Sequence, residues 1–402
     1  MVAKQYDAII VGARCAGSPA AMLLARKGYD VLLVDRATFP SDTISTHLIH
    51  PPGVQALKRW GLLDRLVATG CPAVHTYAFD MGPFVITGTP GPDDAPVSYG
   101  PRRTVLDKLL VDAAAEARVE VREGFAVDEI LRDGDGRVTG IRGHEKGGGN
   151  IVEYARVVVG ADGLHSLVAK SVAAPQYRDK PPLEAGYYTY WSGLEMAGRF
   201  EAYDRGNRAW AAWPTHDDLT VVVLSWPIAE FDANKKDAAR HYLASFDRAP
   251  AFAERVRSAR REERLLGATV PNFFRTPFGP GWALVGDAGY NKDFITAQGI
   301  SDAFRDAELL AGALHDCWSG GREYDAALAG YQTARDEHVL PLYEFTCQFA
   351  SLAPPPAETL QLMAAVHGNQ EAMNGFARVI SGVVSPAEFF SPGNVQRILA
   401  AR

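Results

Sequence analysis

Cysteine is scarce in this sequence, with four residues in 402. Cys15, Cys71, Cys317 and Cys347 stand far apart and form neither a CxxC pair nor a Cys/His cluster. A disulfide framework and a zinc site both need such spacings, so the pattern predicts neither. We therefore expect no bound metal, and we expect the protein to work in the reducing cytoplasm.

Other features are also missing. The sequence has no run of Lys or Arg, and its formal net charge is -7, which argues against a nucleic-acid partner. No apolar run approaches the roughly 20 residues that a membrane span needs. The first residues lead into a strand and not into a basic-then-apolar leader. We expect no nucleic-acid partner and no membrane span.

What is present is the composition of an ordinary globular protein, with 47% hydrophobic and 22% charged residues. The apolar runs at 6–11 and 30–35 flank an alanine-rich segment at 18–27, which predicts a strand, helix and buried parallel strand. Residues 119–154 predict a β-meander before another buried strand at 156–160. The chain therefore opens as a doubly wound α/β domain.

A second lobe interrupts this domain. Residues 187–194, 208–213 and 219–226 alternate or run apolar and aromatic, which predicts strands of one antiparallel sheet. Residues 237–261 and 301–314 read as helices, and a helical tail follows the Pro354-Pro355-Pro356 break. We predict a discontinuous first domain (1–75, 101–175 and 265–345), a second domain (76–100 and 176–264) and a tail (346–402).

A glycine turn carries the first chemistry. Between the first strand and helix the chain reads Gly12-Ala13-Arg14-Cys15-Ala16-Gly17. A helix N-terminus binds phosphate through free N–H groups, and glycine is needed where a Cβ would collide with a pyrophosphate. Arg14 replaces a middle glycine, and its side chain can point away from the phosphates or reach one. Asp35 ends the next strand, where a carboxylate accepts hydrogen bonds from an adenosine ribose and disfavours a 2′-phosphate.

A second turn of this kind lies far along the chain. Gly286-Asp287 ends a buried strand, and a helix begins at Gly299. Two such turns predict one long dinucleotide held at both ends. A nicotinamide dehydrogenase continues with strand and helix units, whereas here a meander and a foreign lobe interrupt the sheet. The topology therefore favours FAD over NAD.

Three motifs together resemble those of the class A flavoprotein monooxygenases, the para-hydroxybenzoate hydroxylase-like enzymes. They are the glycine turn at 12–17, the Gly160-Ala161-Asp162-Gly163 turn, and Gly286-Asp287 followed by Gln298-Gly299-Ile300. The resemblance spans roughly residues 5–345, and related enzymes include geranylgeranyl reductases and flavin-dependent halogenases. It implies a doubly wound FAD-binding domain of the GR2 Rossmann type with an inserted antiparallel substrate domain.

The resemblance also implies which residues hold FAD. Asp35 and Arg36 would lie at the adenosine end, Arg103 would reach the phosphate or ribityl region, and Asp162 would support the turn between the sheets. Asp287 would bond the ribityl chain, and the N–H groups of Gly299 and Ile300 would stabilise charge on the ring. The predicted cofactor-binding residues are Gly12, Ala13, Arg14, Ala16, Gly17, Asp35, Arg36, Arg103, Asp162, Gly286, Asp287, Gly299 and Ile300.

The aromatic strands are the predicted substrate wall. Alternation sends Tyr188 and Tyr190 to one face, and Tyr187 and Trp191 to the other. Relatives commonly carry proline where Phe294 stands, so an aromatic there would stack on the flavin or narrow the substrate channel. The predicted substrate contacts are Tyr188, Tyr190, Trp210, Trp213 and Phe294, and the candidate catalytic residues are His47, Tyr190 and Phe294.

The resemblance implies a monooxygenase that acts on an aromatic or apolar small molecule through a flavin C4a-hydroperoxide. No second glycine fingerprint occurs, so NAD(P)H would bind transiently or a partner reductase would supply electrons. An ene-reductase of the geranylgeranyl type and a non-catalytic flavin carrier remain alternatives. A halogenase would show WxWxIP, whereas this chain has Trp210-Ala211-Ala212-Trp213-Pro214.

Overall fold

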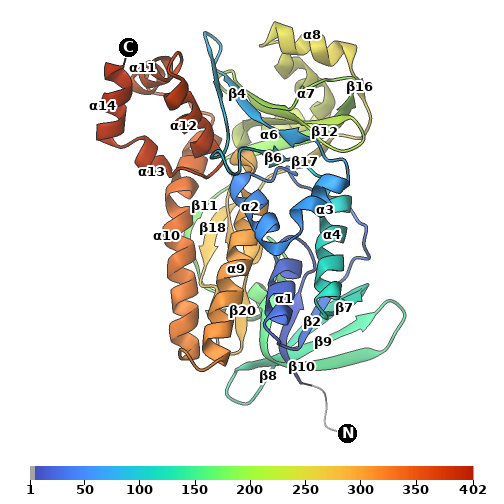
Figure 1. The fold of residues 1–402 in the computed structure, drawn as a ribbon. Helices are drawn as coiled ribbons and strands as arrows, with labels where there is room; N and C mark the ends of the chain where they lie inside the picture. The colour runs from blue at the N-terminus through green and yellow to red at the C-terminus, as the bar shows by residue number, and fades with distance from the viewer. Residues whose placement is uncertain (1–4, 402) are drawn as a thin grey trace.

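The lower half of the molecule is built on a doubly wound parallel sheet (Figure 1). The computed structural model describes residues 5–401. The strands lie in the order β7, β2, β1, β10, β20, and neighbours in this series are parallel. They are β1 Gln5–Val11, β2 Val31–Asp35, β7 Glu120–Glu123, β10 Asn150–Gly160 and β20 Trp282–Leu284. The predicted doubly wound fold is confirmed.

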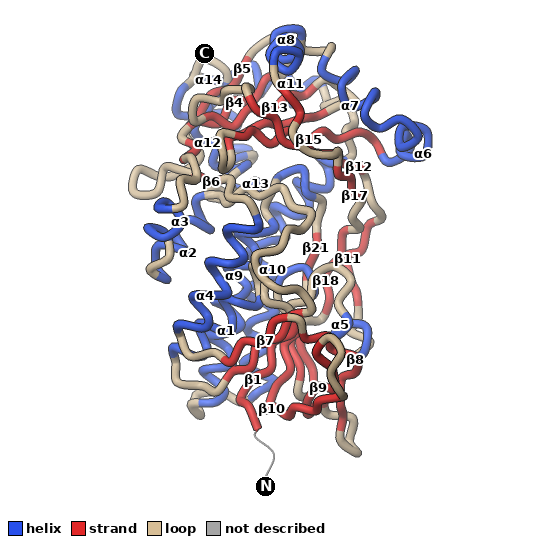
Figure 2. Tube along the Cα trace, turned by 90° about the vertical axis from the view of Figure 1, so that its right-hand side faces the viewer, coloured by secondary structure: helices blue, strands red, loops and turns tan. Residues whose placement is uncertain are grey.

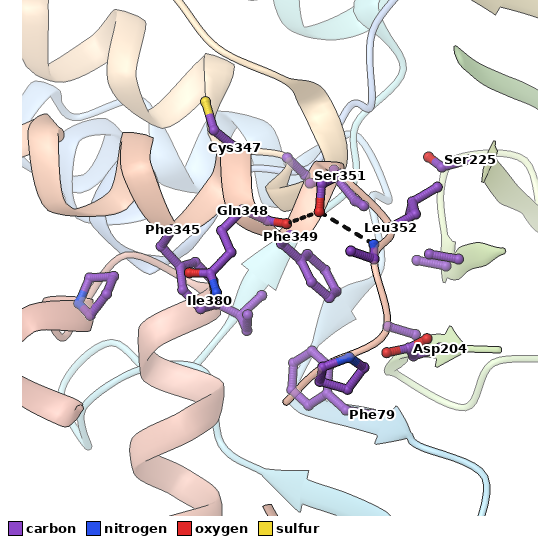
Figure 3. A pocket seen from close by; sticks show the side chains of 18 of the residues that line it. Phe79, Asp204, Ser225, Phe345, Cys347, Gln348, Phe349, Ser351, Leu352 and Ile380 are labelled. Carbon is purple, nitrogen blue, oxygen red and sulfur yellow. Dashed lines mark hydrogen bonds between the residues drawn. The ribbon is translucent and has the colours of Figure 1, made fainter. Parts of the chain in front are cut away.

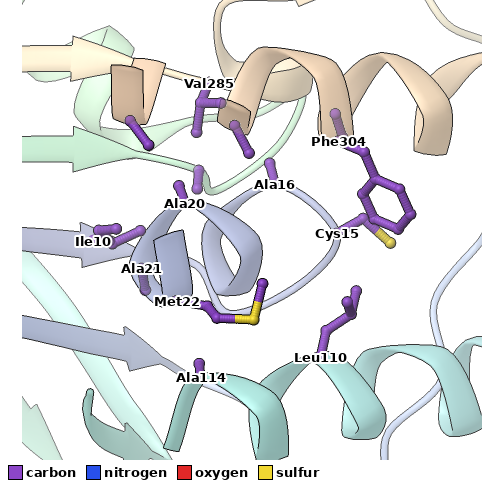
Figure 4. Close-up of a cluster of buried hydrophobic side chains, with 14 of the residues drawn as sticks. Ile10, Cys15, Ala16, Ala20, Ala21, Met22, Leu110, Ala114, Val285 and Phe304 are labelled. Atoms are coloured by element: carbon purple, nitrogen blue, oxygen red, sulfur yellow. The ribbon is translucent and has the colours of Figure 1, made fainter. Parts of the chain in front are cut away.

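Small side chains let the helices approach one face of this sheet closely. Helix α1 (Gly17–Arg26) lies between α4 (Arg103–Glu116) and α9 (Gly299–Trp318) (Figure 4). Ala20, Ala21 and Ala114 are fully or almost fully buried there, and Phe304 of α9 fills the same core. Helices α2 (Pro51–Trp60) and α3 (Leu63–Ala68) extend this layer.

The predicted meander is present, but it begins later than expected. Residues 120–123 join the parallel sheet as β7, because they pair with β2. The meander proper is β8 (Phe125–Arg132), β9 (Val138–Glu145) and the first half of β10, and it covers the other face together with α5 (Leu167–Ser171). The short strand β19 (Phe278–Gly279) closes the edge beside β20.

The upper half is a second sheet, in the order β16, β12, β15, β14, β13, β4, β5 (Figure 2). All neighbours are antiparallel except β13 and β4. Its strands are β4 Thr76–Asp80, β5 Val85–Gly88, β12 Glu184–Ser192, β13 Arg199–Asp204, β14 Ala209–Pro214, β15 Leu219–Pro227, β16 Arg260–Arg261 and β17 Leu266–Ala268, which pairs with β12.

The second sheet buries both faces, and alternation along β12 separates them as predicted. The outer face carries Trp191 and packs on α7 (Ala238–Phe246) and α8 (Pro250–Ser258). These are two helices where one was expected, because Pro250 starts a new helix. The inner face carries Tyr188 and Tyr190. A four-residue helix α6 (Phe231–Asn234) precedes α7.

The inner face packs on the C-terminal tail. Helix α10 (Tyr324–Ala350) runs beside α9, and the tail then folds into α11 (Ala357–Val366), α12 (Gln370–Ile380), α13 (Pro386–Phe389) and α14 (Pro392–Ala400), at the top left of Figure 1. Phe376, Ala377 and Ile380 of α12 share one buried core with Phe79 and Trp213 of the sheet. Within residues 5–401 no helix is both long and apolar enough to cross a membrane.

A small third sheet lies between the two halves. It comprises β11 (Gln176–Lys180), β18 (Asn272–Arg275) and β21 (Tyr290–Asn291). Phe274 and Tyr290 from this sheet pack against Tyr343 of α10. Two-residue strands β3 (Ala73–Val74) and β6 (Ser98–Tyr99) form a separate antiparallel pair. The third sheet therefore anchors the chain just before the loop that leads into α9.

Candidate active site

The turn between β1 and α1 requires glycine at both ends. Gly12 has a φ of +105°, and a Cβ on it would lie 2.4 Å from the Ala161 carbonyl oxygen. A Cβ on Gly17 would lie 1.8 Å from the Gly12 carbonyl oxygen. No side chain caps the start of α1, so its N-terminus keeps the usual form of an anion-binding site.

The three motifs of the sequence meet at this turn. Ala161, from the second motif, contacts Gly12 and Gly17. Gly286, from the third motif, has a φ of +61°, and a Cβ on it would lie 2.8 Å from the Ala16 Cβ. Close backbone packing therefore brings together segments that are far apart in sequence.

Asp35 ties the end of β2 to the glycine turn. Its Oδ2 accepts a hydrogen bond from the Ala13 N–H (2.7 Å), and its Oδ1 accepts one from the Ala37 N–H (2.8 Å). A carboxylate has about four acceptor positions, so two remain for ribose hydroxyls. Arg36, the next residue, is exposed.

Arg14 turns its side chain away from the α1 N-terminus. Its guanidinium bonds Asp107 of α4 (2.5 Å) and the Ser41 hydroxyl (3.0 Å). Asp107 is fully buried and also binds Arg103 through two hydrogen bonds of 3.0 and 3.1 Å. A single buried carboxylate thus holds two guanidiniums, and only the backbone of Arg14 remains in the turn.

Asp162 has a structural partner of its own. Its carboxylate accepts hydrogen bonds from the Ser166 hydroxyl (2.5 Å) and from the N–H groups of Leu167 (2.7 Å) and Val168 (3.2 Å). These bonds hold the start of α5. Burial raises the pKa of Asp162, although the same hydrogen bonds oppose that rise.

Asp287 lies in a short turn, η3 (Gly286–Ala288), next to Arg103. Its side chain is exposed at the surface of the turn, although protein atoms surround it closely. This partial loss of water raises the pKa of the Asp287 carboxyl to about 6, against the attraction of Arg103 and Lys292. The group is well placed to accept hydrogen bonds from a ligand between the glycine turn and α9.

The start of α9 faces open space. Gly299 is exposed, and no heavy atom lies within 4 Å of the position a Cβ would take. The N-cap residue Gln298 does not cap the helix, because its amide donates to the Ile380 carbonyl (2.6 Å) in the tail. The N–H groups of Gly299 and Ile300 therefore have no side-chain cap, and the positive end of a 20-residue helix is presented to any ligand.

Buried charges hold the loop before α9. Lys292 bonds Asp302, and Arg305 bonds both Asp302 (2.6 Å) and Asp306 (2.7 Å). Burial alone would raise the pKa of Asp302, but Lys292 and Arg305 outweigh it and lower that pKa to about 2. Asp302 therefore stays charged and keeps the loop fixed on the first turn of α9.

His47 forms a buried cluster with two predicted aromatic residues. Its φ of +60° is unusual for a residue other than glycine. Its Nε2 forms a hydrogen bond with the Tyr190 hydroxyl, and the Tyr188 ring meets the imidazole edge-on at 5.8 Å between centres. Arg102 lies over the Tyr190 ring at 3.9 Å from its centre.

The charge state of His47 follows from its surroundings. Burial, reinforced by the charges of Arg103 and Arg102, lowers its pKa well below the ordinary value. The imidazole is therefore neutral near pH 7, and its Nδ1 makes no hydrogen bond within the described chain. A buried nitrogen without a partner is costly, so it marks a place where a ligand atom can bind.

A cavity of about 960 Å³ lies between the inner face of the second sheet and the tail (Figure 3). Thr46, Phe294 and Ala297 line it from the half that holds the parallel sheet. The other apolar walls come from the sheet and the tail, and include Phe79, Phe200, Trp213, Val223, Phe345, Phe349, Leu352, Met363, Phe376 and Phe390. The cavity is therefore apolar and aromatic over most of its surface.

The predicted substrate residues divide into two groups. Phe294 and Trp213 line the cavity, and the Phe294 ring lies against Gly186 of β12. Trp210 also reaches the wall, but its ring stacks on Tyr203 and packs with Phe246 in the outer core. Tyr188 and Tyr190 instead lie around His47, as described above.

Some residues of the site were not foreseen. Asp107 stands one helical turn after Arg103, and this i, i+4 spacing of acid and base is a signal that points to it. Phe345 and Phe349 have the same spacing near the end of α10 and both line the cavity. The spacing of Phe345 and Phe349 does not say which surface α10 packs on, so the role of the tail could not be predicted from it.

These features fit FAD. The two glycine turns leave no room for side chains, and the N-termini of α1 and α9 lack side-chain caps. The carboxylates of Asp35 and Asp287 flank these two helix starts as hydrogen-bond acceptors. The model of the family described as an FAD binding domain matches residues 5–346. The chain belongs to this FAD binding domain family. The match supports the predicted FAD cofactor and confirms the assignment to the FAD-dependent oxidoreductases.

Curated relatives extend over different lengths of the chain. Protein FixC of Salmonella typhi is 33% identical over 172 residues, which is 42% of this chain and 39% of FixC. The chain thus spans about two fifths of that relative's length. Digeranylgeranylglycerophospholipid reductase of Methanothrix thermoacetophila is 27% identical over 344 residues, or 81% of this chain and 82% of the reductase.

Solved structures share the fold. The myxobacterial chondrochloren halogenase CndH superposes with a TM-score of 0.81 at 21% identity, covering 95% of this chain and 98% of that one. PqsL, a probable FAD-dependent monooxygenase from Pseudomonas aeruginosa, superposes with a TM-score of 0.73 at 22% identity, covering 92% and 99%. At such identities the likeness concerns the fold alone.

Proposed function

We propose that this protein is an FAD-dependent monooxygenase that hydroxylates or oxygenates an aromatic or other apolar small molecule. The observation that carries the proposal is the aromatic cavity, which begins at Phe294 and Ala297 in the loop before α9. FAD, once bound, supplies the redox chemistry, with electrons from NAD(P)H or a partner reductase and with O2 as the second substrate.

The chain's own residues bind and orient the cofactor in this proposal. Asp35 accepts hydrogen bonds from the adenosine ribose, and the glycine turn holds the pyrophosphate. Arg103 and Asp287, which lie close to one another, would hold the ribityl chain. The N–H groups of Gly299 and Ile300 stabilise negative charge on the reduced ring.

The remaining residues shape the substrate side. Phe294 and Trp213 pack against an apolar substrate, and the tail excludes water. His47 is neutral and holds the Tyr190 hydroxyl in place, while its free Nδ1 takes a hydrogen bond at the ring or substrate. The four cysteines of the protein are all free, which supports a cytoplasmic location.

An ene-reductase of the geranylgeranyl type is the second candidate. Apolar walls contributed by the sheet and by several tail helices would also accept a prenyl chain. The similarity to a reductase of prenyl lipids over most of both chains gives this reading its weight. The two candidates differ in their need for oxygen.

The test begins with the purified protein and its flavin spectrum. Reduction by NADH and by NADPH is then followed without oxygen, in the presence of phenols, indoles or prenyl lipids. A monooxygenase is reduced faster with its substrate and forms product only after oxygen is admitted. Product formed equally well without oxygen would replace the monooxygenase by the reductase. Failure to bind FAD would overturn both.

A further inference from the structure

Two carboxyl groups that the proposed function does not use are buried beside the cavity. Glu184, the first residue of β12, has no exposed surface, and neither of its carboxyl oxygens makes a hydrogen bond within residues 5–401. Asp293 is 1% exposed and directly precedes Phe294. Its Oδ1 accepts the Ile295 N–H (3.0 Å), whereas its Oδ2 lacks a partner in the described chain.

The two carboxyls contact one another. Each is close enough to act as a hydrogen-bond partner of the other once a proton lies between them. Neither takes part in an ion pair in the part of the chain that the structure describes. Two bare carboxylates in contact and away from water would repel strongly, whereas one shared proton supplies the donor that the unpaired oxygens lack.

The surroundings favour retention of that proton. Burial, and then the charge of Asp293, raises the pKa of Glu184 well above its ordinary value. Burial raises the pKa of Asp293 to about 6. On the α10 side the Cys347 thiol faces Asp293, and burial raises its pKa to about 11, so it adds no charge near pH 7.

Ser225 connects the pair with the cavity. It lies on β15, directly opposite Gly186 of β12, and it lines the cavity wall. Its hydroxyl is the neighbour that favours the charged form of Glu184. Alternation along β12 places Glu184 and Gly186 on the inner face with Tyr188. The acid pair therefore lies just behind the wall that carries Ser225 and Phe294.

We propose that Glu184 and Asp293 hold one shared proton and exchange it with the cavity through the Ser225 hydroxyl, as the acid–base device of the proposed reaction. In the forward step a proton leaves the bound molecule and forms a bond to the Ser225 oxygen. The proton that Ser225 already carried passes at the same time to the Glu184–Asp293 pair. Ser225 ends unchanged, the pair loses its one negative charge, and the reverse step restores the single shared proton.

Infrared spectroscopy of the FAD-loaded protein tests the shared proton without turnover. A protonated carboxyl has a C=O stretch that carboxylates lack. The wild type should keep this band at pH 7, where carboxyls with ordinary pKa values near about 4 are ionised. Glu184→Gln and Asp293→Asn should each lose the band, because the new amide supplies the missing donor. Glu195→Gln, an exposed control in the same lobe, should keep it.

Exchange into D2O tests the route through Ser225. The carboxyl band shifts when deuterium replaces the proton, so its time course reports access. Ser225→Ala should slow the shift several-fold, and Ser225→Thr should restore the rate. No band in the wild type, or a band that survives in both acid variants, overturns the shared proton. Equal exchange in Ser225→Ala overturns the route.

Turnover gives a second readout, which distinguishes the role of the acid pair from the proposed function on which that role rests. With a substrate found by the oxygen test, Ser225→Ala should lower kcat about 100-fold with little change in KM, as expected for loss of acid–base catalysis. An unchanged kcat and pH profile would remove the pair from the reaction. If no substrate is oxygenated, the proposed function fails, while the infrared results still decide the proton and its route.

Discussion

Individual side chains in this protein are constrained most tightly where backbone segments touch. The glycine turn is the clearest case, since Gly12 and Gly17 would each place a Cβ well inside the distance of normal contact with a carbonyl oxygen. Asp107 is the polar counterpart, because it holds Arg14 and Arg103 from a fully buried position. Both sites give predictions that a single substitution can test.

Gly12→Ala should abolish FAD binding. The new Cβ would lie 2.4 Å from the Ala161 carbonyl oxygen, at a φ of +105°, so the turn must move. Gly28→Ala is the matched control, because Gly28 has a φ of +92° but no heavy atom within 4 Å of the Cβ position. The Gly28→Ala control should lose only the stability that backbone strain costs, about 1–3 kcal/mol. Flavin content and FAD affinity measure the difference, and a flavin-loaded Gly12→Ala protein would contradict the prediction.

Asp107→Asn should lower the free energy of unfolding by about 3–5 kcal/mol, because it leaves the buried Arg103 guanidinium and the partly buried Arg14 guanidinium without their carboxylate. Asp112→Asn, on the same helix, removes only a half-exposed pair with Lys108 and should cost less than about 1 kcal/mol. Urea unfolding of both variants provides the comparison. Equal losses would mean that Asp107 is not the anchor of the two arginines.

At the scale of elements, the segment from β21 to the start of α9 combines opposite electrostatic effects. Lys292 and Arg305 stabilise the negative charge of Asp302. Asp293, in contrast, is buried beside a second acid, Glu184, and burial raises its pKa. The loop is thus held on one side by ion pairs and carries an easily protonated group on the other. Its stability should therefore depend on pH in two directions.

Stability should fall as pH rises toward 6. Native Asp293 keeps its proton up to a pKa of about 6, whereas an unfolded Asp ionises near about 3.9. Between these values the native state binds more protons, so the free energy of unfolding decreases with rising pH. Glu184 and Asp287 act in the same direction. Urea midpoints of the flavin-free protein should fall over this range, and less so in Asp293→Asn. An identical fall in both proteins would contradict the assignment.

Asp302 changes the free energy of unfolding with pH in the opposite direction. Its pKa is lowered to about 2, so its contribution is fully present above the unfolded value of about 3.9. That contribution is lost as pH falls toward 2. The same urea series, extended to acid, should show a second decline, and Asp302→Asn should remove part of it.

At the scale of the whole molecule, the C-terminal tail completes the cavity. Helices α11 to α13 cover the inner face of the second sheet, and Gln298 ties α12 to the start of α9. The half that holds the parallel sheet, the second sheet and the C-terminal tail therefore meet around one apolar space. The substrate should be selected by the tail as much as by the sheet.

Phe349→Ala should weaken substrate binding about tenfold and leave the FAD content unchanged, because burying a phenylalanine is worth roughly 1.5–3 kcal/mol. Phe349 lines the cavity near the end of α10. Leu360→Ala, on the exposed side of α11, should change neither property. KM and the substrate-induced change in the flavin spectrum measure the effect. A loss of flavin from Phe349→Ala would assign the residue to the cofactor site.

Most of the fold was predictable from local pattern. The buried strands, the glycine turns and the alternation along β12 follow from backbone sterics and side-chain period, which neighbouring residues express directly. One error arose where strand pairing decides the outcome, and another where a proline within the segment starts a new helix. Residues 120–123 became a parallel strand because β2 is beside them, and the helix expected over 237–261 is broken at Pro250.

The sequence by itself determined where glycine must stand and which residues of β12 share a face, and it predicted which motifs hold a nucleotide. Only the tertiary structure decided that Arg14 turns to Asp107, that His47 bonds Tyr190, and that Glu184 meets Asp293. These contacts join residues from different elements, and no local pattern specifies them. Their partners are chosen by which faces pack together, and the same packing makes the tail a wall of the cavity.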